Sequence, residues 1–144
     1  MRGRLAELTS FGPSRRLAEA LAPSTDPVLV DRGLDETDQA RALLMERPSV
    51  GIGAAHDIGP WVERAARGGR LEPSHFLEIA TTLDAIARLG AALAEERRPL
   101  LRDVARDLHP LSALRSTLER SFDPAGELLD PQPRQRSLTQ WTRS

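Results

Sequence analysis

The feature that most constrains the fold is a helical repeat in residues 73–95. Its apolar positions are three or four residues apart over about five turns, which is the period of an α-helix with one buried face. These positions are Phe76, Ile79, Leu83, Ile86, Gly90 and Leu93. Further apolar residues widen the stripe, so we expect this helix to pack on more than one side. A fold organised around such a helix is predominantly α-helical.

Prolines and glycines predict where the other helices begin and end. Asp26 precedes Pro27, a capping residue followed by the residue favoured in a first helical turn. Further helices are expected to open at Pro60, Pro73, Pro99 and Pro110. Gly68 suits the left-handed turn that ends a helix, so the helix from Pro60 should stop near Ala66. The sequence therefore predicts an all-α fold, an antiparallel helical bundle of about six helices.

The spacing of apolar residues also predicts which faces are buried. For the helix after Pro27 the predicted inner face is Val30, Leu34, Thr37 and Leu44. For the helix from Pro60 it is Trp61 and Ala65, and for the last helix it is Leu111, Leu114, Leu118 and Phe122. Gly33 lies inside the first of these helices, where it should cost about 1 kcal/mol relative to alanine.

The carboxyl end has a different character. Residues 122–129, with a turn containing Gly126, predict a short extended segment or a small hairpin. Residues 131–144 contain arginines without acidic partners and show little periodicity, so we expect a disordered or aberrant tail. The predicted organisation is a helical domain over residues 1–130 followed by this tail.

Composition excludes several classes of protein. With 144 residues and a net charge of -1, the chain suits one domain without general attraction to nucleic acid or anionic membranes. It has no cysteine and no apolar run of signal-peptide or membrane-spanning length, which predicts a cytoplasmic protein with no membrane partner. All 20 basic residues are arginine, which we attribute to a genome rich in G and C.

No pattern in the chain predicts catalysis. Gly51-Ile52-Gly53 resembles the start of a dinucleotide-binding loop, but the third glycine and the flanking strand and helix are missing. A phosphate loop of the GxxxxGK type is impossible without lysine. His56, His75 and His109 lack the spacing of metal ligands. We therefore expect no enzyme activity, no catalytic residues, no cofactor and no metal.

Three arginines form the one candidate contact for nucleic acid. Arg64, Arg67 and Arg70 flank the end of the short helix, and Arg64 and Arg67 share a face. Such cations could meet phosphates beside the glycine turn. The alternative is that they complement the dipole at the helix C-terminus, and we favour it because only 3% of residues are aromatic and could stack on bases.

Three blocks of sequence together resemble one protein family. They are LAPSTDPVLVDRGLDETDQARALL, DIGPWVERAARGGRLEPSHFLEIATTLDAIARL and SFDPAGELLD, in the same order and spacing over roughly residues 3–130. This region is similar to the amino-terminal core of the Smr-bearing MutS paralogues of bacteria. In that family it leads into the lever, and the ATPase and the Smr nuclease domain follow further along the chain.

The resemblance implies a role in binding branched DNA and restraining recombination, or in acting on stalled ribosomes. Neither activity belongs to this region alone, so we expect a truncated, non-catalytic helical fragment whose partner is the rest of such a chain or its homodimer. The family's short segment before the first helix is missing, and the tail differs, as a truncated or frameshifted gene would produce. The alternatives are a free-standing helical protein-interaction module and a weak nucleic-acid binder.

Overall fold

The computed structural model of the protein describes residues 2–121, which form seven α-helices and no strand within that range. The helices are α1 (Arg2–Glu7), α2 (Gly12–Ala20), α3 (Pro27–Glu46), α4 (Gly59–Ala66), α5 (Pro73–Ala94), α6 (Pro99–Asp107) and α7 (Ser112–Ser121). The prediction of an all-α fold is confirmed. The predicted extended segment at 122–129 and the predicted tail at 131–144 lie outside the described residues.

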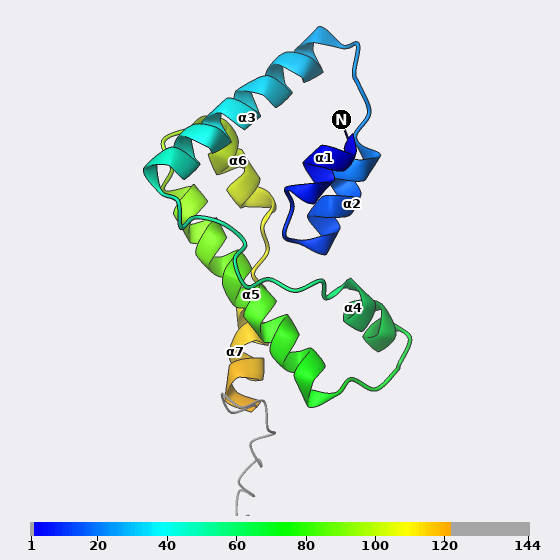
Figure 1. Cartoon of the computed structure of the whole chain (residues 1–144). Coiled ribbons are helices and arrows are strands. Elements are labelled where there is room, and N and C mark those ends of the chain that lie inside the picture. Colours follow the sequence, from blue (N-terminus) through cyan, green and yellow to red (C-terminus); the bar gives the residue numbers. More distant parts are fainter. Residues whose placement is uncertain (1, 122–144) are drawn as a thin grey trace, which may run out of the picture.

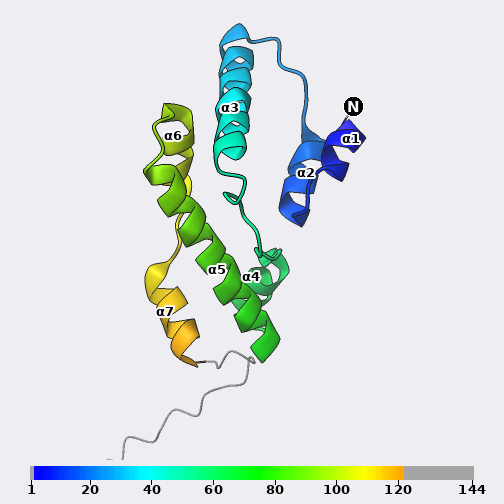
Figure 2. The same ribbon diagram turned by 60° about the vertical axis from the view of Figure 1, so that its left-hand side comes forward.

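Helix α5 is the central helix, along which other helices pack. Helices α6 and α3 pack at its C-terminal end, while α7 and α4 lie at its N-terminal end (Figures 1 and 2). Pro73 occupies the first turn of α5, as predicted. Its buried residues come from more than one face, because Thr82 and Ala85 are buried beside the predicted stripe. The expectation that this helix packs on more than one side is confirmed.

The buried apolar residues form two separate clusters along α5. At one end Leu43, Leu93 and Leu101 pack together, with Ala40, Val50, Leu89, Ala105 and Leu108 around them. At the other end Ile79, Leu83 and Leu118 pack together, with Ile58, Trp61, Leu71, Phe76 and Ala80 around them. The helices are thus arranged around two small cores joined by α5.

Helix α3 begins as predicted but turns an unexpected face inward. The Asp26 carboxylate accepts a hydrogen bond from the backbone N–H of Val28 at 2.9 Å, which caps the helix. The predicted inner face is wrong, since Val30, Leu34 and Leu44 are 40%, 61% and 50% exposed. Leu43 is buried instead, on the opposite side of the helix.

Polar contacts explain the rotation of α3. The Gln39 side-chain oxygen accepts a hydrogen bond from the backbone N–H of Leu100 at 3.1 Å, in the first turn of α6. At the end of α3 the Glu46 carboxylate pairs with the guanidinium of Arg98. Gln39 and Glu46 lie on the same side of α3 as Leu43. Their contacts turn that side toward α6 and leave the predicted face in solvent.

Helices α1 and α2 form a hairpin that packs mainly on itself (Figures 1 and 2). Ala6 and Ala18 are its buried residues. The hairpin is tied to the rest of the chain by the guanidinium of Arg16, which bonds the Asp57 carboxylate at 2.9 Å. Residues 8–11 separate the two helices, and Gly12 begins α2 with Pro13 in its first turn.

Two smaller predictions are also wrong. Ala65 is exposed. Trp61 is the one residue of α4 that is not exposed, and it packs against the cluster on α5. The last helix begins at Ser112 rather than Pro110, since Leu111 has a left-handed φ of 43°. Leu111 and Leu114 are exposed and only Leu118 of that face is buried, while Phe122 lies outside the described residues.

Candidate functional site

The turn after α4 brings the three predicted arginines to one end of the helix. The backbone N–H of Arg67 bonds the carbonyl of Glu63, and Gly68 takes a positive φ of 75°. The N–H of Gly69 then donates to the carbonyl of Arg64 at 2.9 Å. This geometry confirms that glycines end the helix after Ala66, with Arg64, Arg67 and Arg70 exposed around the turn.

The surroundings of these arginines favour the helix-dipole interpretation. The guanidinium of Arg67 lies 4.0 Å from the Glu63 carboxylate, and both side chains are more than 70% exposed. Arg64 and Arg70 form no ion pair within residues 2–121. Cations at a helix C-terminus stabilise its dipole by a few tenths of a kcal/mol when exposed. Contact with nucleic acid through these residues stays a prediction.

A contact that the sequence did not predict attaches α4 to α5. The indole ring of Trp61 stacks on the imidazole of His75, with ring centroids 3.7 Å apart and an interplanar angle of 15°. The Trp61 Nε1–H donates to the Glu78 carboxylate at 2.6 Å. His75 Nδ1 accepts from the backbone N–H of Glu72 at 3.1 Å, beside the start of α5. His75 is therefore a structural residue at a helix entry.

The glycine-containing loop before α4 is held to α5 by one buried hydroxyl. Thr82 Oγ1 accepts the backbone N–H of His56 at 2.9 Å and donates to the carbonyl of Glu78 at 2.8 Å. The loop and α5 enclose a small hollow of about 220 Å³, lined by Ser49, Gly51, Ile52, Gly53, Ala54, Ala85 and Arg88. The Arg88 guanidinium already pairs with Asp84 at 2.7 Å. The loop thus has the geometry of a connection rather than of a dinucleotide site.

A charged cluster joins α3 to the turn between α5 and α6. The buried Glu96 carboxylate accepts from the Arg98 guanidinium at 2.7 Å and from the backbone N–H of Arg97 at 3.0 Å. Burial raises the pKa of Glu96, but these hydrogen bonds outweigh it and leave the pKa below its ordinary value. Arg98 also pairs with Glu46 of α3. These contacts join α3 to the turn before α6, and the charged groups of the cluster are paired with one another.

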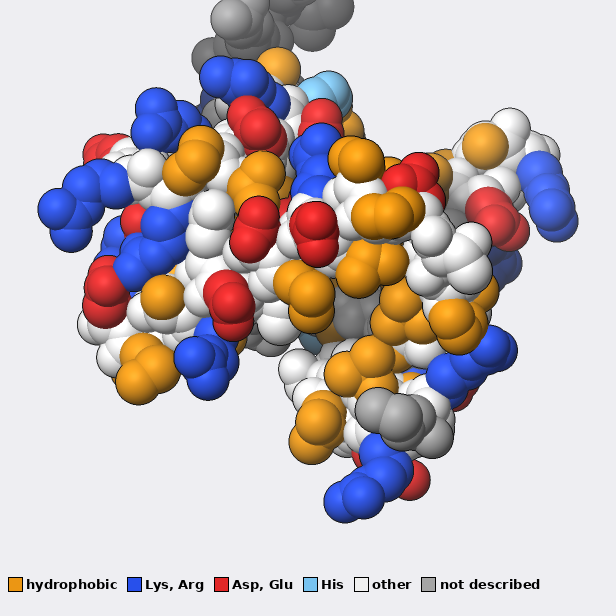
Figure 3. All heavy atoms as spheres, turned by 90° about the horizontal axis from the view of Figure 1, so that it is seen from above, with side chains coloured by type: hydrophobic (Ala, Val, Ile, Leu, Met, Phe, Trp, Pro, Cys, Tyr) orange, Lys and Arg blue, Asp and Glu red, His pale blue; other side chains and the backbone are white. Residues whose placement is uncertain are grey.

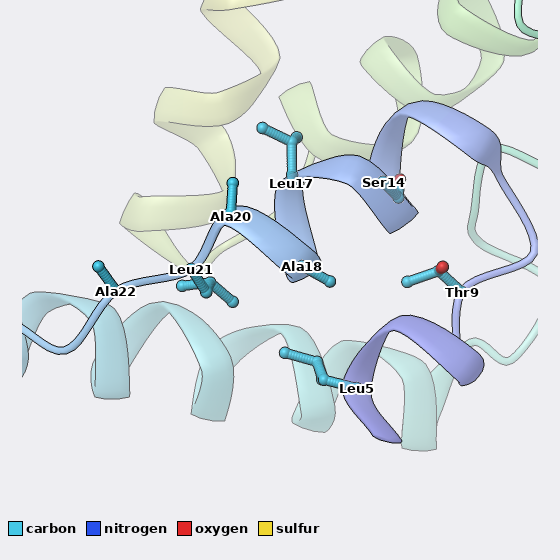
Figure 4. Close-up of a pocket in the computed structure, with 8 residues that line it drawn as sticks. All are labelled: Leu5, Thr9, Ser14, Leu17, Ala18, Ala20, Leu21 and Ala22. Carbon is cyan, nitrogen blue, oxygen red and sulfur yellow. The ribbon is translucent and has the colours of Figure 1, made fainter. Parts of the chain in front are cut away.

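An open hollow lies on the α1–α2 hairpin. Its volume is about 690 Å³, and its walls are mostly apolar (Figure 4). The lining residues are Leu5, Thr9, Ser14, Leu17, Ala18, Ala20, Leu21 and Ala22. Leu5 reaches into the space between the two helices from α1, and Leu21 from the segment after α2 (Figure 4). We call this feature the hairpin hollow.

Helix α3 presents a second apolar surface. Val30, Leu34, Leu44 and Met45 recur at helical spacing on the side opposite Leu43, and they are between 40% and 77% exposed. We call these four residues the outer face of α3. From above, apolar side chains are exposed over much of the molecular surface between acidic and basic ones (Figure 3). Grouped apolar side chains of this kind mark interaction sites.

Within residues 2–121 no group of three His, Asp or Glu side chains is arranged to hold a metal ion. No described helix has the length and apolar content needed to cross a membrane.

Comparison with known proteins relates the chain to part of a larger protein. It is 35% identical to an endonuclease MutS2 of Symbiobacterium thermophilum over 127 residues, which is 88% of this chain and 16% of that protein. It is 39% identical to an endonuclease MutS2 of Geobacillus kaustophilus and 32% identical to one of Halalkalibacterium halodurans, over 97% and 100% of this chain. Each of the latter two proteins is covered over 19% of its length.

The chain thus spans less than a fifth of the length of these relatives. No protein-family model matches the chain. No solved structure matches it either. The predicted relation to the Smr-bearing MutS paralogues is confirmed to this extent: the chain is related in sequence to a part of the MutS2 proteins.

Proposed function

We propose that this chain is a non-catalytic helical fragment equivalent to the amino-terminal core region, near the lever, of a MutS2-like protein of the cytoplasm. Its function is to pack against the rest of such a chain or against its dimer. The observation that carries the proposal is the asymmetry of the similarity, which covers 88% to 100% of this chain but only 16% to 19% of its relatives.

Two structural features support this proposal. The hairpin hollow and the outer face of α3 are apolar surfaces without a partner among the described residues, as expected of a segment that normally packs against further parts of a chain. The polar clusters at Thr82 and Glu96 use their hydrogen bonds internally, which suits a structural role. In the parent protein the fragment would support DNA repair and recombination control, or ribosome rescue, without doing the chemistry.

Reconstitution tests the proposal directly. The MutS2 of Geobacillus kaustophilus would be produced without the segment that matches this chain, and mixed with this chain. We expect co-elution in size-exclusion chromatography at a fixed stoichiometry, because the exposed apolar faces would regain a partner. The excised segment of the relative itself serves as the positive control.

A matched pair of variants locates the contact. L34E places a charge on the outer face of α3 and should abolish co-elution, while V62E places one on exposed α4 and should preserve it. If the relative's own segment rebinds but this chain does not, the proposal is wrong. Such a result would favour the free-standing interaction module.

One observation supports a second candidate, weak binding of nucleic acid. Arg64 and Arg70 are exposed beside Arg67 and unpaired within the described residues, so three guanidinium groups are accessible at one turn. If they contact phosphates, R64E/R67E/R70E should weaken binding to branched DNA and reduce the slope of log affinity against log salt by about two to three. Fluorescence anisotropy over a salt series measures both quantities. Unchanged affinity and slope would exclude this patch.

A further inference from the structure

The hairpin and the first half of α3 are complementary in charge. Residues 2–20 contain four arginines and two glutamates, whereas residues 26–38 contain five carboxylates and one arginine. The hairpin is therefore basic and the start of α3 acidic, within a chain whose net charge is -1. Opposite charges of this kind orient two surfaces that associate.

The charges lie next to the apolar residues of each surface. On α1, Arg2 is three residues before Leu5, so these two share a helix side, and Arg4 is four residues before Leu8 in the turn that ends the helix. On α3, Asp31 and Asp38 are three residues before and four after Leu34 of the outer face. All four charged residues are exposed and none forms an ion pair within the described chain. Each surface therefore has apolar centres flanked by charges of one sign.

We propose that the basic hairpin of one copy of this chain docks on the outer face of α3 of a second copy, beside Asp31 and Asp38, and that the exchange is reciprocal. A two-fold dimer then contains the contact twice. Each copy would offer the exposed residues within 2–21 and 27–45, which is enough chain to supply the about 20–30 residues per partner of a stable interface. Leu5, Leu17 and Leu21 would be covered by Val30 and Leu34 of the other copy.

The structure favours a second copy over closure within one chain. Within one chain the hairpin is attached at another place, since Arg16 of α2 is bonded at 2.9 Å to Asp57, which precedes α4. The segment joining α2 to α3 has only six residues, including Pro23, which limits how the hairpin can reorient. Docking in a second copy leaves the ion pair and this segment as they are. The dimer would use the same two surfaces as the proposed contact with the rest of a MutS2 chain, so it is tested on this chain alone, without a MutS2 partner.

Reciprocal charge reversal tests the proposal. Sedimentation equilibrium of the full chain should show a mass that rises from monomer to dimer with concentration. R2E/R4E makes the hairpin acidic, and D31R/D38R removes the net negative charge of residues 26–38 and places two cations beside Leu34. Each variant alone should associate at least about tenfold more weakly, because the substituted positions then face charges of their own sign. An equimolar mixture should restore the dimer, since both interfaces of the mixed pair are again matched.

Two further samples control the experiment. R70E/R120E reverses two exposed arginines outside both surfaces and should associate like the wild type. The chain with all four substitutions should again dimerise, which shows that the single-surface variants were folded. A wild type that stays monomeric at all concentrations would overturn the proposal. The same result is expected if the hairpin closes on α3 of its own chain. Variants that associate normally, or a mixture that does not recover, would also overturn it.

Discussion

Helices α3 and α5 have apolar residues at similar spacing, but only one of the two apolar stripes is covered. In α5 the apolar stripe is covered, with Ile79, Leu83 and Leu93 buried against α6, α7 and α3. In α3 a stripe of similar spacing, through Val30, Leu34 and Leu44, is exposed. The period of apolar residues therefore indicates that a helix forms. It does not determine whether the apolar face of that helix is covered by the rest of the chain.

Polar contacts that fix the rotation of a helix determine which face is covered. Around α5, Thr82 and Trp61 form hydrogen bonds that agree with the apolar stripe. Around α3, Gln39 and Glu46 bond the start of α6 and the Arg98 guanidinium, on the side opposite the stripe. The outer face of α3 is therefore left exposed, as the proposed contacts with another molecule require.

The largest contrast should come from shortening one leucine in each region. Leu83 is 4% exposed in the core around α7, so L83A should lower the free energy of unfolding by about 2–5 kcal/mol through lost burial and a cavity. L34A removes a side chain that is 61% exposed and should change the same quantity by less than about 0.5 kcal/mol. Urea unfolding at low protein concentration measures both. Equal losses would mean that Leu34 is buried in the monomer.

Loss of the Thr82 hydroxyl should have the next largest effect. T82V keeps the shape but removes the acceptor of the His56 N–H in a part-buried hydrogen bond, which should cost about 1–2 kcal/mol of unfolding free energy. T117V removes an exposed hydroxyl that bonds the carbonyl of Ala113 and is the matched control, with little expected change. Hydrogen exchange of the His56 amide should accelerate in T82V alone. An unchanged rate would show that the Thr82 bond does not protect the loop.

A smaller effect of opposite sign is expected in the exposed region. A Cβ at Gly33 meets no atom within 4 Å, so G33A should stabilise α3 by about 1 kcal/mol through helix propensity. G68A is the control, because Gly68 has a φ of 75° and alanine there should destabilise by about 1–2 kcal/mol. Circular dichroism during urea unfolding measures the two changes. Destabilisation by G33A would indicate that something does approach this side of α3.

Acid should weaken the charged cluster at Glu96. Because its pKa is lowered in the folded protein, the ionised carboxylate contributes stability at pH values above about 4.3, the ordinary glutamate value. That contribution is lost as the pH falls through the lowered pKa. The unfolding free energy of the wild type should therefore exceed that of E96Q at neutral pH, and the difference should shrink in acid. A difference that is independent of pH would contradict this role for the Glu96 charge.

Much of the fold could be predicted from the sequence because its signals are local. The Asp26 cap, the glycine turn at Gly68 and the entry at Pro73 depend on neighbouring residues alone, and all three are confirmed. The covered face of α3 could not be predicted, because it depends on Gln39 meeting a backbone N–H that is 61 residues away. Local patterns cannot contain such a partner.

The candidate site was predictable to a lesser degree. The position of Arg64, Arg67 and Arg70 around one turn was correctly predicted, but their exposure does not decide what they bind. The stacking of Trp61 on His75 and the hairpin hollow had no recognised signal, since each depends on helices brought together by the tertiary fold. The charge difference between residues 2–20 and 26–38 was visible in the sequence, yet its meaning needed the structure, which leaves both segments exposed.

The division of the core into two clusters along α5 has a consequence for how the molecule opens. Leu93 belongs to one cluster and Leu83 to the other, about three turns apart on the same helix. Each cluster can therefore lose its packing while the other stays folded. The two clusters then act as two cooperative units that share helix α5. Slowly exchanging amides should accordingly fall into two groups with different opening free energies, and α5 is the element through which a disturbance at one end reaches the other.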